Sequence, residues 1–365
     1  MTRKQKQGIE SNIPTMNQEQ IANYLLWVMQ SLKNILLVGR PGVGKTDLVK
    51  QACRALGYRA LIAHPVTHNP THYSGLGWVF QMDDGTPRAE FVPYGFLREL
   101  ITTTNERLVM FFDDVGQATN ATQAAMMQLF LERSLNNQKI SDMVSFVAAT
   151  NRREDKAGVG GVLEPLKSRF DAGIIHLQAE LDPWCKWALT HRMPVWLVAY
   201  ARFRPEVITD WEPSADLVNT VCPRTLAFVG ESYNDKLPED MWQPAWSGMI
   251  GVGRTAELLT FYRYHKQIPN PDAIIMNPAD SEIPQQPEIQ YALTAALANK
   301  STERNFEAVI KYFDRWFDGA NFKDGVPRSE FVLSYFKDAI VRTPGLKNTQ
   351  GYVNWFVKHS EVYIG

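Results

Sequence analysis

Residues 39–47 combine glycines, a lysine and a threonine in the order that phosphate chemistry requires. The run fits Gly-x-x-x-x-Gly-Lys-Thr and follows a short apolar stretch, Ile35–Val38. Glycine permits backbone conformations in which successive N–H groups turn toward phosphate oxygens. Lys45 can bring its charge to the β- and γ-phosphates, and the Thr46 hydroxyl can bind Mg²⁺. We therefore predict that a nucleoside triphosphate binds at Gly39, Arg40, Pro41, Gly42, Val43, Gly44, Lys45, Thr46 and Asp47.

Two carboxylates follow a second apolar stretch, Leu108–Phe112. A buried strand that ends in aspartate beside a phosphate loop supplies the oxygen ligand that Mg²⁺ requires. We assign Asp113 to the metal, together with Thr46, and Asp114 to the general base that activates the attacking water. An acidic pair at this place can alternatively cap the helix that follows.

Three further polar residues occur later in the chain. Asn151 follows the apolar run Val144–Ala149, and its amide could hold the lytic water against the γ-phosphate. Arg169 lies ahead of another apolar run, and Arg224 begins a helical pattern. Taken alone, each arginine can equally be a surface residue or an ion-paired one.

Five apolar runs predict the sheet that positions these residues. None of them alternates with period two, which is typical of parallel strands buried on both faces. Helical patterns separate most of the runs, so we predict a doubly wound α/β fold with a five-stranded parallel P-loop core and its ligand at the carboxyl ends of the strands. The runs are Asn34–Val38, Ala60–Ala63, Leu108–Phe112, Val144–Ala149 and Gly173–Leu177.

An insert interrupts this plan between the second and third strands. Two apolar-rich runs, 75–80 and 88–92, flank Asp84-Gly85, which is a strong signal for a β-hairpin at about 75–93. After residue 181 helical patterns continue to the end of the chain, where the predicted helices are 182–200, 214–221, 224–234, 238–266, 288–299, 301–318, 327–341 and 348–360.

These patterns predict five segments. A polar lead-in precedes a helix that begins with a capping box formed by Asn17 and Gln20. A helical lid and a helical C-terminal extension flank a stiff connector that contains five prolines. The predicted bounds are 1–16 for the lead-in, 17–180 for the nucleotide-binding domain, 181–266 for the lid, 267–287 for the connector and 288–365 for the extension.

Composition limits the functional classes. The chain has 365 residues, 45% hydrophobic and 21% charged, which is ordinary for a globular protein. A formal net charge of −1 provides no general attraction to nucleic acid or to an anionic membrane. We expect a cytoplasmic protein, since no apolar run has membrane-spanning length and the N-terminus lacks the apolar core of a signal peptide.

Taken together and in this order, the motifs resemble those of the AAA+ ATPases. The phosphate loop is similar to their Walker A motif and Asp113-Asp114 to their Walker B motif. The resemblance makes Asn151 sensor 1, Arg169 the arginine finger and Arg224 sensor 2. It implies that ATP is the nucleotide, and that the finger reaches the nucleotide of a neighbouring subunit in a ring, usually a hexamer.

The insert narrows this resemblance to the MoxR-type branch, in which a hairpin interrupts helix 2 of the domain. The segments 181–188, 203–206 and 305–312 resemble a bacterial and phage part of that branch. Members are thought to be ATP-driven chaperones that remodel protein partners, often proteins with a von Willebrand factor A-type domain. The resemblance therefore implies a protein client, contacted by the hairpin tip at 83–86.

One residue departs from the family pattern. The usual Walker B motif has glutamate after the metal-binding aspartate, whereas this chain has Asp114. A carboxylate shorter by one methylene lies farther from the water, and a misplacement of ~1 Å can cost ~10²-fold in rate. We therefore expect slow hydrolysis.

Two other functions remain open at this stage. A nucleic-acid motor of the helicase or restriction-translocase type shares the insert, although the balanced charge and the acidic hairpin tip disfavour it. A scaffold gated by nucleotide is the third possibility, with the short Asp114 side chain making ATP a switch. His64, His68 and His72 fall four apart and would line one helical face as metal ligands, but Pro65 and Pro70 would interrupt that helix, so we interpret them as loop residues. Arg152-Arg153 could be a second contact to the nucleotide of a neighbouring subunit, and we favour a solvated pair.

Overall fold

The computed structural model describes residues 13–155, 158–211, 217–317 and 321–359. The chain divides into two compact units, Met1–Ala179 and Glu180–Gly365. The lead-in predicted at 1–16 lies outside the described residues as far as residue 12.

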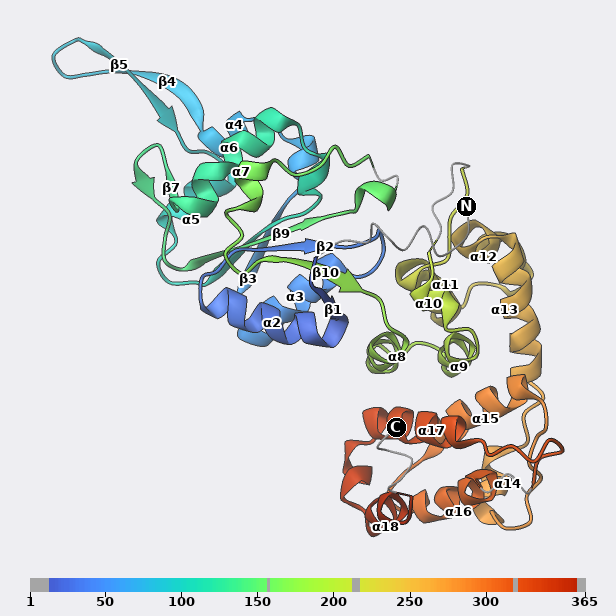
Figure 1. Ribbon diagram of the computed structural model, residues 1–365. Coiled ribbons are helices and arrows are strands. Elements are labelled where there is room, and N and C mark those ends of the chain that lie inside the picture. Colours follow the sequence, from blue (N-terminus) through green and yellow to red (C-terminus); the bar gives the residue numbers. More distant parts are fainter. Residues whose placement is uncertain (1–12, 156–157, 212–216, 318–320, 360–365) are drawn as a thin grey trace. The chain divides into compact units, whose positions relative to one another are not determined.

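A parallel sheet of six strands forms the centre of the first unit (Figure 1). Its order is β1-β10-β2-β9-β6-β3, and every neighbouring pair is parallel. The five predicted strands are all present, and the predicted fold class is confirmed. The sheet has one strand more than we predicted, because β1 pairs with β10 at the edge. The strands are β1 Thr15–Asn17, β2 Ile35–Val38, β3 Arg59–Ala63, β6 Leu108–Phe112, β9 Val144–Thr150 and β10 Ile174–Gln178.

Helices cover both faces of this sheet (Figure 1). The predicted capping box of Asn17 and Gln20 is present at the start of α2. The C-terminal end of α2 is tied to β9 by the buried Ser145 hydroxyl, which donates to the Met29 carbonyl at 2.6 Å. On one face lie α2 Gln18–Gln30 and α3 Lys45–Leu56, and on the other α4 Thr71–Ser74, α5 Phe96–Thr102, α6 Asn120–Leu131 and α7 Glu164–Lys167.

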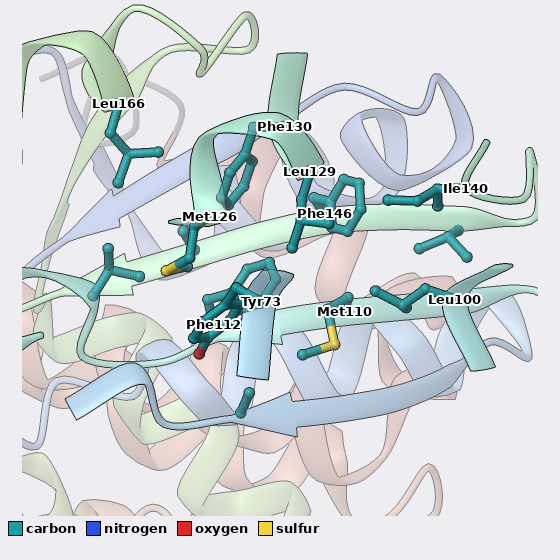
Figure 2. Packing of buried hydrophobic residues seen from close by; sticks show 14 of the residues in the cluster. Tyr73, Leu100, Met110, Phe112, Met126, Leu129, Phe130, Ile140, Phe146 and Leu166 are labelled. Carbon is teal, nitrogen blue, oxygen red and sulfur yellow. The ribbon is translucent and has the colours of Figure 1, made fainter. Parts of the chain in front are cut away.

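Aromatic side chains fill the layer between the sheet and α6 (Figure 2). Phe112 of β6 and Phe146 of β9 have ring centroids 6.0 Å apart, and Phe130 of α6 packs against both at 5.3 and 5.5 Å. Tyr73 of α4 adds a fourth buried ring. These aromatic contacts hold α4 and α6 against β6 and β9.

Two hairpins extend from the first unit. The predicted insert hairpin is present as β4 Leu76–Gln81 and β5 Pro87–Val92, with Gly85 at a φ of 81° in the turn. It projects from the rest of this unit, and each of its strand residues is exposed (Figure 1). A shorter hairpin, β7 Ser134–Leu135 and β8 Gln138–Lys139, follows α6.

Helices make up the second unit, but two long predicted helices are each divided. The helix predicted at 182–200 is α8 and α9, since Pro194 precedes α9 and cannot continue a helix. The helix predicted at 238–266 ends and restarts at Gly251, whose φ is 85°. Of the helix predicted at 214–221, residues 214–216 lie outside the described residues and residues 217–221 are not helical. The helices are α8 Leu181–Thr190, α9 Val195–Phe203, α10 Glu206–Thr209, α11 Pro223–Asn234, α12 Trp242–Ile250, α13 Val252–His265, α14 Pro271–Met276, α15 Pro287–Lys300, α16 Phe306–Phe317, α17 Ser329–Arg342 and α18 Gln350–Lys358.

The proline-rich segment is packed, which differs from the predicted connector at 267–287. It contains α14, and its Ile274 and Ile283 are buried in the same hydrophobic cluster as Trp316 and Phe331.

Short 3₁₀ turns complete both units at η2 Pro65–Thr67, η3 Val115–Gln117, η4 Arg153–Asp155, η5 Glu239–Met241 and η6 Pro344–Asn348. In the described part of the chain, each helix is too short or too polar to cross a membrane.

Candidate active site

The phosphate loop connects the end of β2 to the start of α3. Gly42 and Gly44 have φ angles of 74° and 102°, a region that side chains other than glycine rarely adopt. Gly44 is also the residue that precedes α3, so the positive end of this helix faces the loop. A Cβ at Gly39 would lie 3.2 Å from the Leu177 carbonyl oxygen, so a larger residue there would have to shift its neighbours in β10. The glycines therefore shape a loop with the geometry of an anion site.

Lys45 is buried at the start of α3. Its Nζ donates to the carbonyl oxygens of Gly39 at 2.7 Å and Arg40 at 3.2 Å, and to Asn151 Oδ1 at 2.7 Å. These bonds hold the ammonium group against the loop, where it adds a positive charge to the partial charge of the helix N-terminus. The contact with Asn151 joins the loop to the end of β9.

Thr46 and Asp113 form the candidate metal site. The Thr46 hydroxyl donates to Asp113 Oδ2 at 2.6 Å. Asp113 follows β6, and its backbone N–H donates to the Ala63 carbonyl of β3 at 2.9 Å, which fixes the carboxylate at the edge of the sheet. A hydroxyl and a carboxylate are the oxygen donors that Mg²⁺ binds in P-loop proteins, so this pair fits the predicted metal.

Asp114 and Asn151 lie beside that pair. Asn151 Nδ2 donates to Asp114 Oδ1 at 2.9 Å, while the Oδ1 of the same amide accepts from Lys45. Since β9 lies between β2 and β6 in the sheet, its end places Asn151 between the loop and the two aspartates. Asp114 has a φ of 60°, which Asp tolerates better than most residues. The structure thus links Lys45, Asn151 and Asp114 in one hydrogen-bonded row.

Arg169 lies after α7 and is partly exposed. Its guanidinium donates to the Pro165 carbonyl, and its Nε has no hydrogen-bond partner. Among the described residues, no hydrogen bond or ion pair joins Arg169 to the phosphate loop or to the two aspartates. The Arg169 carbonyl accepts from the buried Asn34 amide at 3.1 Å, which fixes the backbone at this residue.

Arg224 is the second residue of α11 and is exposed. It belongs to the second compact unit, so its part in the site stays a prediction.

Of the Arg152-Arg153 pair, Arg153 is exposed as predicted, whereas Arg152 differs from the predicted solvated state. Arg152 forms a bidentate pair with the buried Asp155, in which Nη2 lies 2.7 Å from Oδ1. Arg153 donates to the Gly160 carbonyl at 2.7 Å. Both arginines therefore hold the segment after β9 in place.

The side chain of His68 packs against those of His72 and Tyr73. The His68 and His72 rings stack with centroids 4.5 Å apart, and His68 Nδ1 lies 2.8 Å from the Tyr73 hydroxyl. Burial lowers the pKa of His68, and the neighbouring His72 and His64 lower it further.

Sequence reasoning missed two buried amides that hold segments of the domain together, Asn34 and Gln123. Asn34 precedes β2 and donates to the carbonyls of Phe130 and Arg169, which lie 96 and 135 residues away in the chain. No local pattern marks such a residue, because its partners come from distant segments.

Residues 34–170 match the model of the family described as "AAA domain (dynein-related subfamily)". The chain contains an AAA domain. The match covers the loop, both aspartates, Asn151 and Arg169, and it supports the AAA+ part of the predicted resemblance. This family is one of P-loop ATPases, so nucleotide binding, usually with Mg²⁺, is what the AAA domain implies.

Solved structures similar to the chain share low identity with it. A mutant of RuvB from Thermotoga maritima is 16% identical, with a TM-score of 0.40, and the match covers 77% of this chain and 82% of that one. The Thermotoga maritima RuvB Holliday junction branch migration motor is 16% identical, with a TM-score of 0.37 and coverages of 77% and 81%. NtrX from Brucella abortus is 16% identical, with a TM-score of 0.33 and coverages of 60% and 47%. No curated protein matches the chain.

Proposed function

We propose that the AAA domain binds ATP with Mg²⁺ and hydrolyses it. The observation that carries this proposal is the row Lys45–Asn151–Asp114 beside the Thr46–Asp113 pair, which puts a cation, a carboxylate base and a metal-binding pair at one edge of the sheet. When bound, ATP supplies the reacting triphosphate, and Mg²⁺ neutralises part of the negative charge of that triphosphate.

The residues have separate parts in this proposal. Thr46 and Asp113 hold the metal, and Lys45 with the loop N–H groups binds the phosphates. Asp114 accepts the proton of the attacking water, and Asn151 fixes the orientation of that carboxylate through its 2.9 Å bond. The wider site includes Arg40, Pro41, Val43 and Asp47 of the loop segment, and Arg224 as a sensor of the bound phosphate.

We further propose that the active form is a ring, a hexamer as is usual in this branch, in which Arg169 acts on the neighbouring subunit's nucleotide. The partly exposed side chain and the fixed backbone of Arg169 support this role. A trans-acting arginine of this kind contributes ~10³–10⁵ in rate.

The client that we propose is a protein, remodelled in the manner of MoxR-type chaperones. The insert hairpin presents large apolar side chains to solvent: Trp78 is 59% exposed, Val79 60% and Phe91 54%. Its charged residues are Asp83, Asp84 and Glu90 against a single arginine, Arg88, and this acidic balance disfavours phosphate backbones. A von Willebrand factor A-type protein is the partner that the resemblance suggests.

The deciding experiment measures ATP turnover against protein concentration, together with particle size with and without Mg²⁺·ATP. We expect specific activity to rise steeply with concentration as rings assemble. Arg169→Ala should assemble but lose at least ~10³-fold in turnover. The control is Arg54→Ala, which removes an exposed arginine at the far end of α3. A monomer that hydrolyses ATP equally well with and without Arg169 would refute the ring.

Two further measurements separate the alternatives. Salt-sensitive binding to DNA that stimulates hydrolysis would favour a nucleic-acid motor over a protein remodeller. Single-turnover kinetics with a long-lived ATP state would favour the nucleotide-gated scaffold.

A further inference from the structure

A buried glutamine joins two segments of the AAA domain that the active site uses. Gln123 lies on α6 and is 1% exposed. Its Nε2 donates to the carbonyl oxygens of Ala118 at 3.1 Å and Gly161 at 2.9 Å, and its Oε1 accepts from the Leu163 N–H at 2.9 Å. Burying an amide is costly unless its groups are paired, and here both donors and the acceptor are paired. The side chain is therefore held in one orientation.

The first partner, Ala118, flanks the turn that follows the candidate base. This turn, η3, is Val115–Gln117, with Asp114 directly before it and Ala118 directly after it. The Ala118 N–H donates to the Val115 carbonyl at 3.1 Å, which closes the turn. A shift of Asp114 that moves η3 is thus transmitted to the Gln123 amide.

The other two partners belong to the segment that leads to Arg169. Leu163 precedes α7, and its carbonyl accepts from the N–H groups of Leu166 and Lys167 at 2.9 and 3.0 Å. Arg169 follows α7 closely, and its own N–H donates to the Leu166 carbonyl at 3.1 Å. The Gln123 bond to Leu163 therefore fixes the start of the helical segment that presents Arg169.

A second contact joins the same two segments. The Gly161 N–H donates to the Gly116 carbonyl at 3.2 Å. A Cβ at Gly116 would lie 2.3 Å from Thr150 Oγ1 and 3.0 Å from the Val159 side chain, so the two backbones approach closely. The segment around Gly161 rests directly on the η3 turn, and the Gln123 amide spans that junction.

We propose that Gln123 is a positioning residue that couples the Asp114 turn of one subunit to the Arg169 that the same subunit offers to its neighbour. The proposal rests on the ring of the proposed function. Because its three bonds are directional and buried, the η3 turn cannot move by an ångström without breaking one of them or moving the Arg169 segment. Gln123 in this way links the hydrolytic states of adjacent sites.

The test uses mixed rings in which only one kind of site can turn over. Subunits with Arg169→Ala keep a complete loop and base but offer no finger, and subunits with Lys45→Ala offer a finger but bind no ATP. Their mixture should regain turnover at the Arg169→Ala sites. Gln123→Met, which has a similar volume and lacks all three bonds, is then added to the Lys45→Ala subunit alone.

We expect this change to lower kcat of the mixed ring at least tenfold, with KM for ATP unchanged, although the altered subunit performs no hydrolysis. Because this subunit binds no nucleotide beside its own Asp114, the loss reports only the placement of its Arg169. Gln123→Met in the Arg169→Ala subunit alone should lower kcat as well, because it removes the bond to Ala118 beside the η3 turn of the site that turns over. The control is Gln128→Met in the same subunit, since Gln128 is more accessible on the same helix. Thermal unfolding and ring size are measured for each subunit. If Gln123→Met does not fold, Gln123→Glu takes its place in the test, because glutamate keeps an oxygen that accepts from the Leu163 N–H.

Two outcomes overturn the proposal in different ways. If the mixture of Arg169→Ala and Lys45→Ala subunits shows no turnover while the wild type does, the trans-acting site itself is refuted, and the coupling with it. If the mixture is active and Gln123→Met gives the same kcat as Gln128→Met, only the coupling role of Gln123 is refuted.

Discussion

At the scale of single residues, the backbone of Asp114 explains part of its departure from the family pattern. Its φ of 60° lies in the left-handed region, which Asp tolerates better than Glu. We predict that Asp114→Glu restores reach toward the water and raises kcat by up to ~10²-fold. The same change should lower stability by about 1 kcal/mol because of the left-handed backbone. Steady-state kinetics and thermal unfolding measure the two effects.

Asp114→Asn is the matched variant, since asparagine accepts the same backbone conformation and cannot take a proton. It should bind ATP as the wild type does and show no turnover. If Asp114→Asn and the wild type turn over equally fast, Asp114 is not the base.

Residues of the loop could be predicted from the sequence because their roles are local. Glycines at fixed spacing, a lysine and a threonine mark the loop within a few positions, and the Asp113-Asp114 pair marks the end of one strand. Gln123 and Asn34 could not be predicted, because the burial of each depends on at least one partner that is 38 or more residues away. The pairing of Arg152 with Asp155 was missed although the two residues are close in sequence, since burial decides it.

At the scale of elements, a buried ion pair joins α9 to α17 in the second unit. Arg202 and Asp338 form a bidentate pair in which both side chains are almost fully buried. We predict that Asp338→Asn lowers the free energy of unfolding by about 3 kcal/mol, because it leaves the Arg202 charge buried with too little compensation. Chemical denaturation measures this loss.

Asp182 provides the control for that prediction. It also contacts Arg202, at 2.9 Å, but its side chain is 48% exposed. Asp182→Asn should therefore cost less than about 1 kcal/mol. Equal losses for the two variants would contradict the argument from burial.

Elements with a strong periodic pattern could be predicted, and their boundaries less well. The five apolar strands are present, but β1 has only three residues and pairs at the sheet edge, so no periodicity marks it. Pro194 and Gly251 divide predicted helices, although both residues are ordinary signals of a helix end. The pattern of buried apolar residues continues across each break, so the pattern alone predicts one long helix in each case.

At the scale of the whole molecule, each unit has its own hydrophobic cluster and at least one histidine with a lowered pKa, since His359 of the second unit joins His265 in this respect. Burial lowers the pKa of His68 in the first unit and of His265 in the second. The Nδ1 of His265 is buried without a hydrogen-bond partner, which is consistent with a neutral ring. Both units should therefore respond to acid in the same direction.

The direction follows from proton binding. Below pH ~6.5 the unfolded chain protonates these histidines, whereas the folded chain does not until the pH falls to their lowered pKa values. The unfolded state then binds more protons, so the contribution of these histidines to the free energy of unfolding is complete above pH ~6.5 and is lost as the pH decreases.

We predict a lower Tm at pH ~5.5 than at pH ~7.5, and each ~1 kcal/mol lost lowers Tm by about 2–4 °C for a unit of this size. His265→Gln, which cannot titrate, should reduce this difference for the second unit, with the exposed His191→Gln of the same unit as the control. Identical pH dependence in the wild type and His265→Gln would show that the ring of His265 is protonated in the folded state or that its burial has no effect on stability.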